Sequence, residues 1–307
     1  MSIESFLQYM QYEKNYSSHT VAAYSRDLTQ FVFFIKAHYE DTASDWEHVQ
    51  TYMIRDWVVS LMEEKNNPKT VNRKLSAVKS LYNFLIKNGM AKTNPVKHVA
   101  GPKISKQLPV FVKEKEMNLL LDDVFEIKDF ESSRDKLIIE FFYLTGIRRA
   151  ELIELKPEDI DSYLMQLKVT GKRNKQRIIP FGQELLSHIK EYEKYKKEEV
   201  TSPDNYFFVR TNGEKMYPKL VYLIVQKCLT TVSSLHKRSP HVLRHTFATV
   251  MLNHQAGLNH VKEILGHSSL AATEIYTHVT FEELKKVYHE AHPREETASQ
   301  KKEVLWK

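Results

Sequence analysis

The spacing of apolar positions predicts that the first part of the chain is helical. Apolar residues recur every three or four positions over residues 2–13, 17–39, 51–65 and 67–89, which is the spacing of one helix face. Ser18 is the expected N-cap of the second helix, and Gly89 should end the fourth. Because four amphipathic helices can share one core, we expect residues 1–93 to form an N-terminal helical domain.

Proline and glycine mark the end of this domain. Residues 94–109 hold three prolines and one glycine, so we expect a linker there rather than regular structure. A second domain should then occupy residues 110–292, and residues 293–307 are expected to form a flexible tail. An apolar helix in this domain, over residues 135–145, should end at Gly146.

The period of the pattern changes from helical to alternating over residues 163–181. This segment is rich in β-branched residues on both sides of "GKRN", which predicts a β-hairpin with a basic tip. Helical spacing returns over residues 182–200 and 220–232. The predicted fold class is therefore mainly α, with a small antiparallel sheet in the second domain.

The composition indicates the cellular compartment in which we expect the protein. No apolar run approaches the roughly 20 residues that a membrane helix needs, and the first residues lack the basic and apolar regions of a secretory signal. The single cysteine, Cys228, excludes an internal disulfide framework and a zinc site built from cysteines. We therefore expect a cytoplasmic protein.

The positive charge is concentrated in one stretch. The formal net charge is +6, yet Lys65 to Lys106 contains ten Lys or Arg and no Asp or Glu. The fourth helix carries a cationic and hydroxyl-bearing stripe opposite its apolar face, which suits contact with a phosphate backbone. A merely solvated face is the alternative. The candidate DNA-binding residues are Lys69, Arg73, Lys74, Ser76 and Ser80.

Two segments carry an arginine at a helix boundary, and the first of them can bind a phosphate. In "SPHVLRHTFATVML", Ser239 and Pro240 are a typical helix start, which places His241 and Arg244 on one face of the first turn. In "YLTGIRRAELIEL", Arg148 follows a buried helix and Glu151 can orient it through a bidentate pair. An ordinary helix start and an ordinary salt bridge are the alternatives.

Two further segments supply a lysine, a histidine and a tyrosine. Lys172 is expected at the hairpin tip, where lysines are also common for no functional reason. In "EILGHSSLAATEIYTHV", Gly266 should end a helix, so that His267 lies in a turn. Ser268 or Ser269 then caps a helix that carries Tyr276. This break lets His267 and Tyr276 share a site, although on one straight helix they would face opposite ways.

Taken together, the motifs resemble those of the tyrosine recombinase family, and the C-terminal part resembles its Xer branch. The resemblance covers nearly the whole chain and implies a SAM-like four-helix core-binding domain before the catalytic domain. It also implies DNA strand exchange through a 3′-phosphotyrosyl intermediate on Tyr276, without metal or other cofactor. The matching strings are "TGIRRAEL", "GKRNKQR", "HVLRHTFAT" and "LGHSSLAATEIYTH". The catalytic residues it implies are Arg148, Lys172, His241, Arg244, His267 and Tyr276.

The resemblance also implies partners. Strand exchange on two duplexes needs a homo- or hetero-tetramer on its DNA site, for the Xer branch often with a second Xer-type recombinase and an FtsK-like DNA translocase. The helix over residues 282–292 is expected to pack on a neighbouring subunit, with packing on its own domain as the alternative.

Resolution of chromosome dimers at cell division is the biological role that the resemblance favours. An integrase or excisionase of a mobile element and a type IB-like topoisomerase are alternatives within the enzyme class. A non-catalytic DNA-binding protein is the alternative outside it.

Overall fold

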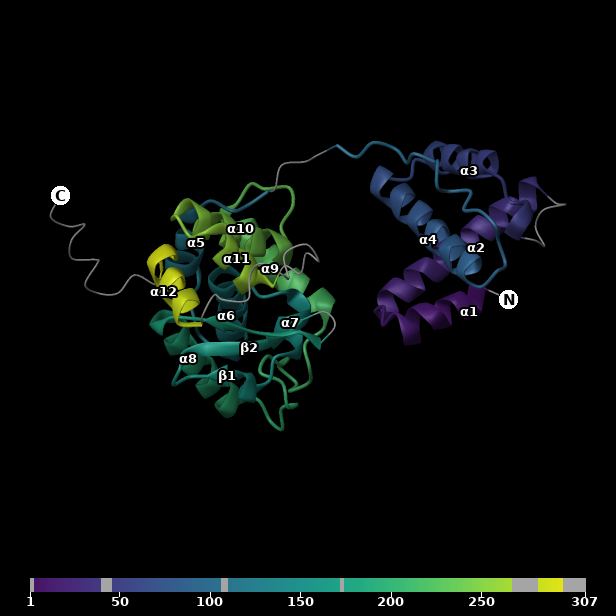
Figure 1. Cartoon of the computed structure of the whole chain (residues 1–307). Helices are drawn as coiled ribbons and strands as arrows, with labels where there is room; N and C mark the ends of the chain where they lie inside the picture. Colours follow the sequence, from purple (N-terminus) through teal and green to yellow (C-terminus); the bar gives the residue numbers. More distant parts are fainter. Residues whose placement is uncertain (1–2, 40–45, 106–109, 172–173, 267–280, 295–307) are drawn as a thin grey trace. The chain divides into compact units, whose positions relative to one another are not determined.

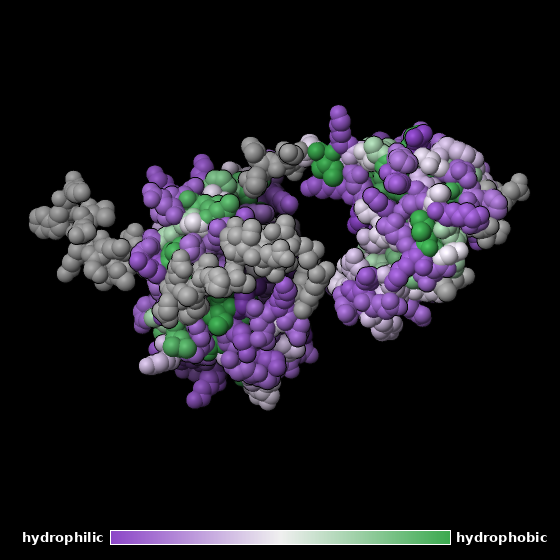
Figure 2. All heavy atoms as spheres, viewed as in Figure 1, coloured by the Kyte–Doolittle hydropathy of each residue, from purple (hydrophilic) through white to green (hydrophobic). Residues whose placement is uncertain are grey.

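The computed structural model describes residues 3–39, 46–105, 110–171, 174–266 and 281–294. The chain divides into two compact units, residues 1–107 and 108–307 (Figure 1). Each unit has its own hydrophobic core. On the face that Figure 2 shows, hydrophilic residues cover most of the surface of both units. Among the described helices, none is both long and apolar enough to cross a membrane.

The first unit contains the predicted helices. They are α1 (Ile3–Gln8), which continues as a π-helical turn over Tyr9–Glu13, α2 (Ser18–His38), α3 (Thr51–Glu63) and α4 (Pro68–Lys87), with a 3-10 turn at Trp46–His48. The rings of Phe31 and Trp57 lie 4.8 Å apart between centroids and join α2 to α3 in the core. The predicted cap of α2 was wrong by one residue, because Ser17 accepts the backbone N–H of Thr20.

Helix α4 has the two faces that its sequence predicts. Asn67 caps it by accepting the backbone N–H of Lys69 at 2.9 Å, and Pro68 occupies the first turn. Val71 and Val78 are fully buried, while Lys69 is exposed. Gly89 follows the helix with φ of 69°, a conformation that glycine adopts without steric cost.

Part of the predicted linker packs on the first unit. The side-chain amide of Asn94 donates to Asn83 Oδ1 at 2.8 Å, and that of Asn72 donates to the carbonyl of Pro102 at 2.9 Å. Between them Val96 is buried. The chain is therefore attached to α4 as far as Pro102, so the linker expected from residue 94 begins inside packed structure.

The second unit is α-rich with one small sheet. Its elements are α5 (Glu114–Asn118), a π-helical turn (Leu119–Val124), α6 (Phe130–Thr145), α7 (Arg149–Glu154), a 3-10 turn (Pro157–Asp159), β1 (Ile160–Asp161), β2 (Gln166–Thr170), β3 (Gln176–Pro180), α8 (Gln183–Glu199), α9 (Pro218–Val232), α10 (Pro240–Asn253), α11 (Leu258–Leu265) and α12 (Phe281–Ala291). The three strands are antiparallel in the order β1-β2-β3, with Val169 paired to Arg177. The predicted hairpin is thus β2–β3, and the two-residue β1 was too short to predict.

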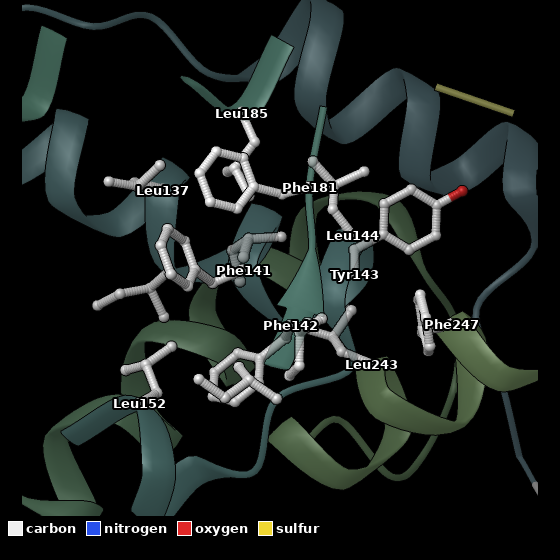
Figure 3. Packing of buried hydrophobic residues seen from close by; sticks show 14 of the residues in the cluster. Leu137, Phe141, Phe142, Tyr143, Leu144, Leu152, Phe181, Leu185, Leu243 and Phe247 are labelled. Carbon is white, nitrogen blue, oxygen red and sulfur yellow. The ribbon is translucent and has the colours of Figure 1, made fainter. Parts of the chain in front are cut away.

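Helix α6 is the centre of the second core. It is buried around nearly its whole circumference, because it packs against α8, α9 and α10 at once. Figure 3 shows Phe141, Phe142 and Leu144 of α6 among side chains from neighbouring elements. The helix ends, as predicted, at Gly146 with φ of 59°; a Cβ there would come within 2.5 Å of Phe247, so only glycine fits.

Helix α12 packs on its own unit. Leu284, Tyr288 and Ala291 are buried in the second core, where α12 contacts α10, α11 and β3. Figure 1 shows α12 in yellow at the edge of this unit. In the single chain the apolar stripe therefore packs within its own domain, as the alternative reading expects, and packing on a neighbouring subunit stays a prediction.

The chain beyond α12 is anchored for at least three residues. His292 is fully buried against Phe247, and the Arg294 guanidinium binds the carboxylates of Asp122 and Glu184. The flexible tail predicted from residue 293 therefore does not include Arg294, and residues 295–307 lie outside the described part of the chain.

Candidate active site

Arg148 is fixed between two elements. It is the N-cap of α7, directly after the turn at Gly146, and its backbone N–H donates to Glu151 Oε2 at 2.9 Å. Its Nη1 donates to Glu151 Oε1 and its Nη2 to the carbonyl of Gly266, both at 2.7 Å. The side chain is still 30% exposed, so a held guanidinium keeps an open side for a ligand.

Arg244 reaches the same place from α10. It is the fifth residue of that helix and is buried, and it donates to the carbonyls of Gly146 and Leu265. Burial, and then the charges of Arg148 and Arg177, lower its pKa to about 9. The guanidinium is therefore still protonated at neutral pH, and the fold holds two positive charges close together.

Arg177 is a third arginine at this site, and the sequence-based prediction missed it. It lies on β3, where its Nε donates to the carbonyl of Ile264 at 2.7 Å. Its Nη1 and Nη2 donate to the two carboxylate oxygens of Glu151 at 2.7 and 2.8 Å. The alternation of β3 contained a signal, because Arg177 shares the inward face with the buried Ile179, where a charge needs a partner.

Glu151 joins these arginines. The predicted bidentate pair with Arg148 was wrong in its partner: Arg177 makes the bidentate pair, and Arg148 makes one side-chain and one backbone hydrogen bond. Burial favours the neutral carboxyl, but hydrogen bonds from Arg177 and Arg148 outweigh it, so the pKa of Glu151 is lowered. A buried carboxylate therefore offsets the charge of two guanidiniums.

Helix α10 begins where the sequence predicts, but the predicted capping hydrogen bond is not formed. Ser239 is the N-cap and Pro240 follows it, but Ser239 Oγ makes no capping hydrogen bond. His241 lies on the first turn and remains exposed. Desolvation, and then the charges of Arg149 and His245, lower the pKa of its imidazole, which is therefore neutral at pH 7 and can accept a proton.

Three candidate residues, Lys172, His267 and Tyr276, lie outside the described residues, but the residues before two of them are described. Gly171 precedes Lys172, and a Cβ on Gly171 would lie 3.6 Å from Arg148 Nη1. Gly266 precedes His267, and its carbonyl accepts Arg148 Nη2. It ends α11 with φ of 63°, as the sequence predicts. The chain thus approaches Arg148 from both segments.

The candidate DNA-binding residues of α4 differ in their exposure and in their contacts within the protein. Lys69 and Ser76 are exposed, and the hydroxyl groups of Ser76 and Ser80 donate to helix carbonyls at 2.8 Å. Arg73 is also exposed, but its guanidinium is paired with Asp27. Lys74 is buried and donates to Gln30, so its assignment to direct DNA contact is corrected.

In the part of the chain that the structure describes, no three His, Cys, Asp or Glu side chains gather closely enough to hold a metal ion.

A cluster of arginines around one buried carboxylate, in a mainly helical domain, is an arrangement that can bind a phosphodiester. The phage integrase family profile matches residues 111–283, and the profile of the N-terminal SAM-like domain of phage integrases matches residues 3–89. The chain therefore belongs to the phage integrase family of tyrosine recombinases, enzymes that break and rejoin DNA strands at specific sites.

Curated relatives match over most of their length. A tyrosine recombinase XerC of Chlorobaculum parvum is 38% identical, with 95% of this chain and 94% of the relative covered. A tyrosine recombinase XerC of Bacillus licheniformis is 35% identical, with 94% and 95% covered.

Solved structures share the fold. The XerH site-specific recombinase bound to a palindromic difH substrate has a TM-score of 0.68 at 21% identity, with 89% of this chain and 80% of that chain covered. The Tn1549 transposon integrase in complex with transposon right end DNA has a TM-score of 0.68 at 18% identity, with 93% and 98% covered. The predicted mainly α fold with a SAM-like N-terminal domain is confirmed.

Proposed function

We propose that this recombinase resolves chromosome dimers for segregation at cell division, with Tyr276 as its nucleophile. The observation that carries the catalytic assignment is the pair of arginines, Arg148 and Arg244, that bind adjacent carbonyls at the end of α11. The names of the XerC relatives support the biological role.

The proposed reaction balances within the side chains of the site. The phenol of Tyr276 has an ordinary pKa near 10 and needs help to attack phosphorus. Arg148 and Arg244 bind the non-bridging oxygens and offset the charge of the transition state. As Tyr276 Oη bonds to phosphorus, the bond to the 5′-oxygen breaks and Lys172 protonates that oxygen. His241 and His267 hydrogen-bond the phosphate, and one of these imidazoles accepts the proton that the phenol loses.

The intermediate preserves the energy of the broken bond. A 3′-phosphotyrosine replaces the phosphodiester, and the 5′-hydroxyl of another strand can attack it in the reverse sense. The arginines supply the positive charge that this exchange needs, so we propose that it requires neither ATP nor a metal ion. Because Glu151 fixes Arg148, the phosphate would meet a guanidinium that is already aligned.

The proposal extends to assembly and DNA binding. We propose that Lys69, Arg73, Ser76 and Ser80 of α4 face the DNA backbone, because they lie on a helix without acidic residues. Exchange between two duplexes needs four sites, which supports a tetramer, formed alone or with a second Xer-type recombinase. Activation by an FtsK-like translocase and a cytoplasmic location belong to the same proposal; the single cysteine agrees with that location.

A nicked suicide substrate tests the nucleophile. Cleavage beside the nick releases a short strand, so the covalent protein–DNA adduct cannot be resealed and is counted on a denaturing gel. The unaltered chain should form the adduct, and Tyr276→Phe should abolish it. Tyr163→Phe is the control, because Tyr163 is 92% exposed on the same unit. An adduct that persists in Tyr276→Phe refutes the nucleophile, and no adduct from the unaltered chain favours a non-catalytic DNA-binding protein.

A further inference from the structure

Three consecutive carbonyls at the end of α11 each accept a different arginine. Ile264 accepts Arg177, Leu265 accepts Arg244, and Gly266 accepts Arg148. The last carbonyls of a helix have no partner within the helix and carry the negative end of its dipole, so they attract cations. The end of α11 is therefore a template that sets the spacing of three guanidiniums.

Arg177 differs from the other two arginines in how its donors are used. Its Nε, Nη1 and Nη2 all donate within the protein, to Ile264 and to both oxygens of Glu151. Arg177 is thus poorly placed to bind a phosphate and well placed to hold the groups that hold Arg148.

The contacts of Arg177 connect distant segments. It lies on β3, opposite Val169 of β2, and binds both α7 through Glu151 and the end of α11 through Ile264. The turn at Gly266 is packed closely on it, because a Cβ there would lie 3.0 Å from Arg177 Cδ. Removing Arg177 would remove the hydrogen bonds that hold Glu151 and the Ile264 carbonyl, and Arg148 binds Glu151 and the Gly266 carbonyl two residues further on.

We propose that Arg177 is a positioning residue for strand cleavage. It aligns the Arg148 guanidinium with the scissile phosphate by holding Glu151 and the end of α11, and it makes no contact with DNA itself. This inference rests on the proposed cleavage chemistry. Since a small misplacement of a catalytic group can cost about a hundredfold in rate, the effect should be large.

The first measurement is single-turnover adduct formation on the nicked suicide substrate at saturating DNA. Arg177→Met should slow adduct formation about tenfold to a hundredfold, while the dissociation constant for DNA stays within about twofold. Arg177→Lys keeps the charge but cannot bind Glu151 bidentately and Ile264 together, so it should show a similar defect. Lys168→Met is the control, because it removes a charge from the exposed face of the same hairpin.

Two modified substrates separate alignment of Arg148 from delivery of the leaving-group proton. A methylphosphonate at the scissile position removes the charge that the arginines offset, so it should shrink the gap between Arg177→Met and the unaltered chain to about threefold or less. A bridging 5′-sulfur leaves without a proton, since a thiol is far more acidic than an alcohol, so it should leave the gap unchanged.

The outcomes distinguish this inference from the proposed function. If the unaltered chain forms no adduct, the cleavage chemistry fails and the inference fails with it. If the unaltered chain forms an adduct and both Arg177 variants match its rate, only the role of Arg177 is refuted. Rescue by the sulfur substrate alone would also overturn the inference, because Arg177 would then act through the hairpin that carries Lys172. Where Arg177→Met does not fold, Arg177→Lys decides by the same measurements.

Discussion

Asp27 in the first unit and Glu151 in the second are buried carboxylates beside two cations, and the two arrangements differ in how firmly the cations are held. Asp27 in the first unit and Glu151 in the second each have side chains only 3% exposed. Asp27 binds Arg73, with Lys74 Nζ 3.5 Å away, whereas Glu151 binds Arg148 and Arg177.

The two arrangements differ in the groups that bind the cations besides the carboxylate. In the first unit Arg73 is 42% exposed, with a single carboxylate partner. In the second unit the carbonyls of α11 bind Arg148 and Arg177 from another side. A carboxylate alone neutralises charge, but a carboxylate with fixed carbonyls also sets geometry. Binding a DNA backbone tolerates the looser arrangement, while in-line chemistry at phosphorus requires the tighter one.

Removing each carboxylate charge should affect the two units in different ways. Glu151→Gln should lower the unfolding free energy by about 3–5 kcal/mol, because it leaves buried guanidiniums without their counter-charge. It should also slow adduct formation about a hundredfold. Asp27→Asn should destabilise the chain but leave adduct formation at saturating DNA unchanged. Denaturant unfolding and single-turnover cleavage measure both, and an equal loss of cleavage in the two variants would refute the distinction.

A second prediction concerns pH and the anchored end of the second unit. Burial lowers the pKa of His292 to about 3, so this imidazole stays neutral in the folded chain while the unfolded chain takes up a proton near pH 6.5. Its contribution to stability is therefore complete above about pH 7 and falls by up to about 1.4 kcal/mol per pH unit as the pH drops toward 3.

Replacing the imidazole of His292 isolates its contribution to the pH dependence of the unfolding free energy. His292→Phe retains the stacking on Phe247 and Tyr288 but does not titrate, so its unfolding free energy should depend less steeply on pH. Denaturant unfolding of both chains between about pH 4 and about pH 7 gives the two slopes, because histidine changes its protonation in this range. Identical slopes would mean that His292 is not held neutral.

The smallest expected effects are on DNA binding by α4. Lys69→Ala should reduce the slope of log affinity against log salt by about 0.9, the value for one lost phosphate contact. Arg73→Ala should reduce it less, because Asp27 already offsets part of that charge. Salt titrations of DNA binding measure both, with Lys36→Ala on α2 as the control. An equal change for Arg73 would show that Asp27 releases it on DNA.

Local features of the fold were predictable from the sequence. The helix ends at Gly146 and Gly266 follow from glycine after an apolar run, and both residues do adopt the left-handed conformation. The hairpin follows from the change to an alternating pattern. The cap of α2, the two-residue β1 and the attachment of Pro102 to α4 were missed, because each depends on one or two hydrogen bonds rather than on a repeated pattern.

The candidate site was predictable in its residue types and less so in its contacts. Arg148 and Arg244 were found because each follows a recognisable helix boundary. Arg177 was missed, since one arginine in a short strand does not reveal its partner. Lys74 was assigned to the DNA-binding surface from its place in a basic stretch, yet Gln30 and Asp27 of α2 bury it.

The sequence by itself determined where helices and strands form and which charged groups the chain carries, because these depend on spacing and on residues close together. Only the tertiary structure decided that three arginines share the end of α11 and that α12 packs on its own unit. Arg148 meets Gly266 across 118 residues, Arg244 meets Gly146 across 98, and Arg177 meets Ile264 across 87. Such partners are chosen by the packing of whole elements around α6, which no local pattern encodes.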